Sequence, residues 1–72
     1  MGIQEYTKIF CRNIHCRRGK AGLSNLELSQ RSGVALEMLE ALERGEIPKE
    51  MVVDDAFDLA RAFGCKVSEL FK

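Results

Sequence analysis

The sequence predicts one small all-α domain, a compact arrangement of five helices that occupies residues 1–72. Apolar residues recur at steps of three and four along most of the chain, which is the period of one helix face. Glycines separate these periodic stretches, and no stretch shows a persuasive strand pattern. Apolar residues make up 46% of the chain and charged residues 31%, a mixture typical of a folded globular domain.

The first helix is expected from Ile3 to about Arg18. Gly19-Lys20-Ala21-Gly22 is expected to break it, because glycine adopts backbone conformations that other residues resist. The apolar face of this helix consists of Ile3, Tyr6, Ile9, Phe10 and Ile14.

The second helix is expected to start after Ser24 and to run to about Ser32. Ser24 can cap the open N–H groups, and Glu27 stands three residues later, as in a capping box. Gly33 is expected to end this helix in a sharp turn, with Val34 as an apolar plug between two helices.

The third helix is expected from about Leu36 to Arg44. Leu39 and Leu42 lie three residues apart and should face the core, and Gly45 should stop the helix. The two-helix unit thus covers about residues 24–44.

Glu46 to Glu50 forms a connection that contains the only proline, and a fourth helix follows from about Val52 to Gly64. A short final helical turn should close the core. The predicted apolar face of the fourth helix consists of Val53, Ala56, Phe57, Ala60 and Phe63, and that of the final turn of Val67, Leu70 and Phe71.

Apolar runs such as Met51-Val52-Val53 reach only three residues, far short of the roughly 20 residues of a membrane span, and the first six residues lack a signal-peptide pattern. We therefore expect a cytoplasmic protein without a membrane partner. Three cysteines form no C-x-x-C pair, which favours reduced thiols. Cys11, His15 and Cys16 could converge on a metal, but a closed zinc site needs four ligands, so no metal or cofactor is expected.

Eleven basic and eleven acidic residues give a net charge of zero, but the charges are unevenly distributed. Residues 1–20 carry five basic residues and one acidic, and residues 21–72 carry six basic and ten acidic. This balance is unusual for a nucleic-acid-binding protein, which generally has a basic face. Catalysis is not expected either, because His15 is the only histidine and no catalytic set or glycine-rich phosphate loop is present.

Three stretches of the chain resemble the Cro and lambda-repressor family of helix-turn-helix domains, also described as the xenobiotic response element type. The first is Leu23-Ser24-Asn25-Leu26-Glu27-Leu28-Ser29-Gln30-Arg31-Ser32-Gly33-Val34, and the second is Leu39 and Leu42 with Glu43-Arg44-Gly45. The third is Ala56-Phe57-Asp58-Leu59-Ala60-Arg61-Ala62-Phe63-Gly64 followed by Val67, Glu69, Leu70 and Phe71, so the resemblance covers roughly residues 9–71.

The resemblance implies a transcriptional regulator that binds double-stranded DNA, as a homodimer on a two-fold symmetric site. In this family the third helix enters the major groove and the start of the second grips phosphate. The residues that it places at DNA are Ser24, Asn25, Leu36, Glu37, Met38, Ala41, Arg44 and Lys49. It also implies that Glu43 pairs with Arg18 or Arg17 of the first helix, although Arg17 stands where a leucine is expected.

The predicted reading face carries no cation before Arg44, because its exposed positions are Leu36, Glu37, Met38, Glu40 and Ala41. Glu37 could accept a hydrogen bond from cytosine and Met38 could pack on a thymine methyl group. Glu40 stands four residues before Arg44 and could pair with it. The alternative is a helix-turn-helix scaffold that binds a protein through Leu26, Leu36 and Met38.

Overall fold

Helices account for the whole regular structure of the described residues, 3–72, in the computed structural model. The four α-helices are α1 (Ile3–Ala21), α2 (Asn25–Ser32), α3 (Leu36–Glu43) and α4 (Val53–Phe63). A 3₁₀-helix, η1 (Val67–Phe71), follows them. The all-α prediction is therefore confirmed for these residues. The five-helix prediction is not, because its last member is a single 3₁₀ segment and the α-helices number four.

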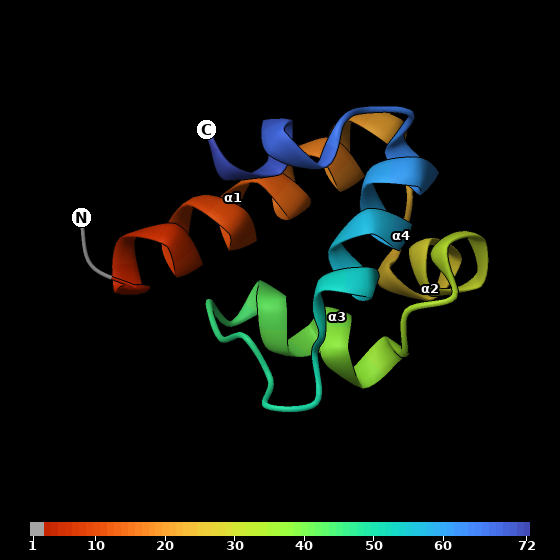
Figure 1. Cartoon of the computed structure of the whole chain (residues 1–72). Helices are drawn as coiled ribbons and strands as arrows, with labels where there is room; N and C mark the ends of the chain where they lie inside the picture. The colour runs from red at the N-terminus through yellow and green to blue at the C-terminus, as the bar shows by residue number, and fades with distance from the viewer. Residues whose placement is uncertain (1–2) are drawn as a thin grey trace.

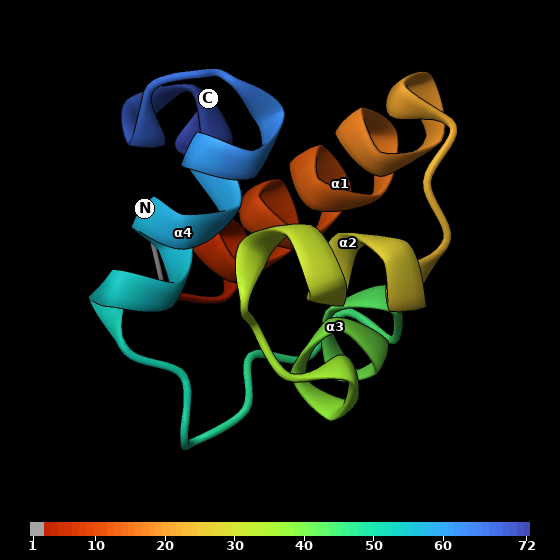
Figure 2. The same ribbon diagram turned by 90° about the vertical axis from the view of Figure 1, so that its right-hand side faces the viewer.

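The elements enclose one apolar core. α1 packs against α3, α4 and η1, and α2 packs against α3 and α4 (Figures 1 and 2). The largest side chains that are almost fully buried come from every element and from the turn after α2: Phe10, Leu28, Val34, Leu39, Leu42, Leu59 and Leu70. No helix among residues 3–72 combines the length and the apolar character needed to cross a membrane.

The end of α1 differs from the prediction. The helix continues through Gly19 to Ala21 and ends at Gly22, rather than near Arg18. The N–H groups of Gly22 and Leu23 bond to the carbonyls of Gly19 and Arg18, at 3.1 Å each, which closes the last turn. A glycine costs a helix only about 1 kcal/mol relative to alanine, so one interior glycine did not suffice to stop it.

The C-terminal residues are fastened to α1. The Asn13 side-chain amide donates hydrogen bonds to the carbonyls of Leu70, at 2.8 Å, and Lys72, at 3.2 Å. Phe71 stacks on Phe10 with 5.0 Å between ring centroids. Leu70 is fully buried, as predicted, but Phe71 remains 38% exposed, so it covers the core rather than entering it.

The buried face of α4 also differs from the predicted one. Ala56, Leu59 and Ala60 are buried, whereas Val53 is 68% exposed and Phe57 48%. The buried face of α4 is therefore rotated about the helix axis relative to the face that periodicity predicted. An apolar stripe of α4 consequently faces outward.

Two glycines provide a matched test of backbone conformation. Gly33 has φ +82°, a conformation that costs a residue with a side chain about 1–2 kcal/mol. Gly19 instead has a helical conformation, because it lies inside α1. A methyl group added at either position would meet open space. We expect Gly33→Ala to lower the free energy of unfolding by about 1 kcal/mol or more and Gly19→Ala to raise it by up to about 1 kcal/mol. Urea unfolding followed by circular dichroism measures both, and equal effects of the two variants would contradict the assigned conformations.

Candidate nucleic-acid interface

The N-terminus of α2 is closed by its own side chains. Ser24 Oγ accepts a hydrogen bond from the Glu27 N–H at 3.1 Å, and the Ser24 N–H donates to Glu27 Oε1 at 3.0 Å, which confirms the predicted capping box. The backbone and side-chain hydrogen bonds from Ser24 lower the pKa of the exposed Glu27 carboxyl. A negative charge therefore stands beside Ser24 and Asn25, where the family resemblance places a phosphate.

The turn between α2 and α3 has three residues, 33–35, and its polar groups are paired. The Gly33 N–H bonds to the Ser29 carbonyl at 2.8 Å, and the Val34 N–H bonds to Ser32 Oγ at 3.1 Å. Ser29 Oγ donates to the Val34 carbonyl at 2.6 Å, while the Val34 side chain is buried in the core. These bonds fix where α3 begins relative to α2, as predicted from Gly33 and Val34.

The outward side of α3 is acidic. Glu37 and Glu40 are exposed, and Leu36 is half-buried at the first helical position. α3 also begins without a side-chain cap at Ala35, so its first N–H groups are open to an incoming acceptor.

Ala41 is not part of this surface, so the prediction that it contacts DNA was wrong. Ala41 is buried at 6% exposure, and the chain folds back at the end of α3. The Gly45 N–H bonds to the Leu42 carbonyl at 3.0 Å, and the Glu46 N–H bonds to the Ala41 carbonyl at 2.9 Å. Gly45, with φ +80°, thus ends the helix as predicted.

The apolar patch predicted around α2 and α3 is smaller than expected. Leu26 is 54% exposed, but Leu36 is half-buried and Met38 packs against the core. Only Leu26 of these three presents most of its side chain to solvent.

The two cations of the predicted interface lie after α3. Arg44 is exposed, and its Nε lies 3.4 Å from Glu46 Oε2 rather than beside Glu40, which contradicts the predicted Glu40–Arg44 pair. Lys49 is exposed in the segment between α3 and α4. Ion pairs between exposed side chains contribute little, so the Arg44 guanidinium remains available to a phosphate.

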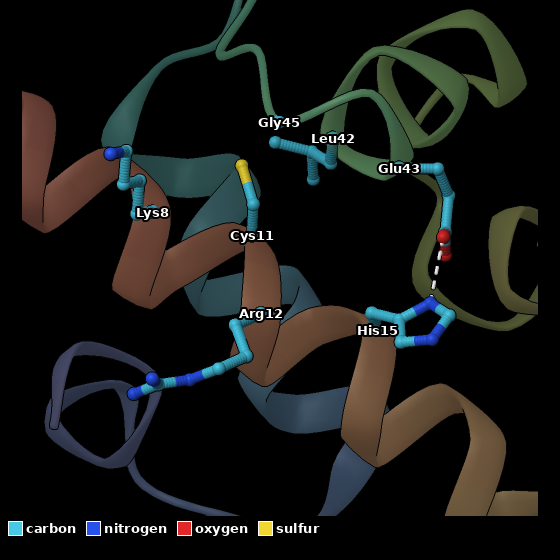
Figure 3. Close-up of a pocket in the computed structure, with 7 residues that line it drawn as sticks. All are labelled: Lys8, Cys11, Arg12, His15, Leu42, Glu43 and Gly45. Carbon is cyan, nitrogen blue, oxygen red and sulfur yellow. Dashed lines mark hydrogen bonds and ion pairs between the residues drawn. The ribbon is translucent and has the colours of Figure 1, made fainter.

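Glu43 connects the end of α3 to α1, as the family resemblance implied. Arg18 Nε donates to Glu43 Oε1 at 2.8 Å, and Arg18 Nη1 donates to the Leu23 carbonyl at 2.8 Å. The other carboxylate oxygen lies 2.7 Å from Nδ1 of His15, which points toward it from α1 (Figure 3). Arg17 pairs instead with Glu69 of η1, Nη2 to Oε2 at 3.5 Å, which explains an arginine at a position expected to hold leucine.

The environment of Glu43 favours its ionised form. Partial burial opposes ionisation, but hydrogen bonds from Arg18 and His15 outweigh it and lower the pKa of the carboxyl. The side chain is 25% exposed, so these bonds are only partly screened by water. Glu43 therefore serves to hold α3 against α1, and its carboxylate is not free to read bases.

His15 is the residue of this cluster that the sequence did not reveal. It lies one turn before Arg18 on α1, so the two side chains share a face, but the acidic partner comes from α3. A depression of about 320 Å³ lies here, lined by residues of α1, of the end of α3 and by Gly45 (Figure 3). Its lining residues are Lys8, Cys11, Arg12, His15, Leu42, Glu43 and Gly45.

The cysteines do not form the metal site considered above. Cys11 is buried, whereas Cys16 is exposed, so their thiols do not converge. Within residues 3–72 no three side chains of histidine, cysteine, aspartate or glutamate are grouped as metal ligands.

No protein-family model, no curated protein and no solved structure matches the chain.

The Glu43 cluster predicts a pH-dependent contribution to stability. The folded-state pKa is lowered, so the contribution is present above the unfolded-state pKa of about 4.3 and is lost as pH falls through the folded-state value. We expect Glu43→Gln to lower the free energy of unfolding by about 1 kcal/mol at pH 7. Chemical denaturation of both proteins from pH 7 to pH 3 measures the difference, which should shrink toward low pH. A difference independent of pH would contradict the lowered pKa.

Proposed function

We propose that the chain is a DNA-binding transcriptional regulator of the helix-turn-helix type. The observation that carries the proposal is the unit formed by α2, the three-residue turn at Gly33 and α3. Two helices joined by a turn of this length with a glycine form the supersecondary unit that places its second helix in the major groove.

The position of α3 supports this proposal. Figure 2 shows α3 along the lower side of the molecule, with α2 above it and α1 behind. Its inner side is held by buried Leu39 and Leu42, and its far end by Glu43. A rigidly held helix with one free side is what insertion into a groove requires.

Readout would depend on few groups. Glu37 can accept a hydrogen bond from a cytosine amino group, and the Arg44 and Lys49 side chains can neutralise phosphates. The carboxylates of Glu37 and Glu40 oppose binding to the polyanion. We therefore expect weaker binding than in proteins with a basic face, with a shallow dependence on salt.

The proposal is tested by titrating isotopically labelled protein with mixed-sequence duplex DNA at two low salt concentrations. Amide signals of α2 and α3 should shift, and the shifts should diminish at the higher salt concentration, because phosphate contacts release counterions. A duplex that perturbs no amide of these two helices would refute DNA binding.

Substitution of the cations should affect all DNA sequences alike. Arg44→Ala and Lys49→Ala should each weaken binding severalfold and reduce the slope of log affinity against log salt by about 0.9, since each removes one phosphate contact. Lys72→Ala is the control, because the C-terminus lies on the opposite side of the molecule from α3 (Figure 1). An unchanged salt slope in both cation variants would count against the phosphate contacts of Arg44 and Lys49.

Glu37→Ala should instead change the preferred base.

A second candidate is a helix-turn-helix scaffold that binds a basic protein segment. The specific observation that favours it is that one two-helix unit exposes both Leu26, on α2, and the carboxylates of Glu37 and Glu40, on α3. Leu26→Lys should then abolish the protein complex. Retention of the complex in Leu26→Lys would exclude this surface.

A further inference from the structure

We propose that a second copy of this chain binds to the outer face of α4, so that two α4 helices pack antiparallel across a two-fold axis. The outer face consists of Val53, Asp54, Phe57 and Arg61. This inference concerns association of the free protein and does not require that the chain bind DNA.

The first observation is the concentration of exposed apolar side chains at this place. Of the seven large hydrophobic residues that are exposed among the described residues, four lie between positions 47 and 57: Ile47 at 42%, Val52 at 58%, Val53 at 68% and Phe57 at 48%. Isolated exposed hydrophobic residues are ordinary, but a contiguous group on one face marks an interaction surface. Valine and phenylalanine four residues apart on a helix lie next to each other.

The second observation is a depression of about 430 Å³ beside Phe57. The side chains that line it are Phe57, Ala60, Arg61, Cys65, Lys66 and Val67. One face thus carries both a protruding aromatic ring and an apolar hollow floored by the small Ala60. Two copies related by a two-fold axis near Phe57 would each insert this ring toward the hollow of the other, as an isologous interface requires.

The third observation is the distribution of charge along α4. Asp54, Asp55 and Asp58 lie in its first half, and Arg61 and Lys66 lie toward and beyond its end. The antiparallel arrangement brings Arg61 of each copy beside Asp54 of the other, whereas a parallel arrangement would oppose like charges. Arg61 is available for this contact, because its side chain is 80% exposed. Its present partner is Asp58, with 3.5 Å between Nη1 and Oδ1, and such exposed pairs contribute little to stability.

The interface must extend beyond α4 to reach the size of a standard dimer interface. A standard interface covers about 800 Å² on each partner, and the surface of the whole chain is 4767 Å². α4 is only 11 residues long, so the interface would also take in the exposed Val52 at its N-cap and the exposed Ile47 in the preceding segment. In Figure 2, α4 forms the left side of the molecule and α3 its lower side, so a dimer through α4 leaves α3 uncovered.

Sedimentation equilibrium of the full chain without DNA, over about 1–500 μM, tests the proposal. We expect a monomer–dimer equilibrium in which Phe57→Glu raises the dimer Kd by at least about tenfold. Tyr6→Glu is the matched control, since Tyr6 of α1 is 47% exposed, almost the same as Phe57, and should leave the dimer unchanged. Circular dichroism verifies that both variants retain their helices.

The charge pattern gives a second, independent readout. Asp54→Arg and Arg61→Asp should each weaken self-association, because each places like charges opposite one another. An equimolar mixture of the two variants should form heterodimers about as well as the unmodified chain, because both contacts are then complementary. A monomer at every concentration, a dimer unaffected by Phe57→Glu, or a mixture without recovery would each overturn the proposal. None of these results bears on whether α2 and α3 contact DNA, so failure of this interface is distinguishable from failure of the proposed function.

Discussion

The position of α3 depends on the turn at Gly33, where backbone conformation, side-chain hydrogen bonds and core packing agree. The positive φ of Gly33 turns the chain, two serines satisfy the polar groups of the turn, and Val34 enters the core beneath it. Leu28 and Leu39 are then buried from either side of this turn. Because the domain is small, the same few side chains both form its core and orient its candidate binding helix.

A second constraint acts at the other end of α3. Glu43 is held by Arg18 and His15, and the chain then folds back over Ala41. The helix is thus fixed at its beginning by a backbone turn and at its end by charged hydrogen bonds to α1. These two attachments leave one side of α3 free, which is why the proposed DNA contacts fall on Glu37 and on the cations after the helix rather than on its whole length.

The sequence predicted the features that depend on neighbouring residues. The Ser24–Glu27 capping box and the Gly33 turn are local signals, and both were predicted correctly. Of the features that depend on distant segments, the Glu43–Arg18 pair was expected from the family resemblance, and others were not predicted. The burial of Ala41 was not predicted, and the partner of His15 comes from another helix. Periodicity also misplaced the buried face of α4. Val53 and Phe57 have the spacing of an apolar helix face, but this spacing does not show whether another helix or solvent lies against that face.

The contrast between the cysteines has a practical consequence for chemical labelling. Burial, together with the nearby Glu43 carboxylate, raises the pKa of the Cys11 thiol and so reduces its reactive thiolate form. Cys16 lies on the exposed side of α1, and Cys65 is half-buried beside the α4 hollow. A maleimide probe added to the folded protein will therefore attach first at Cys16, which makes this helix a natural site for a fluorophore or spin label.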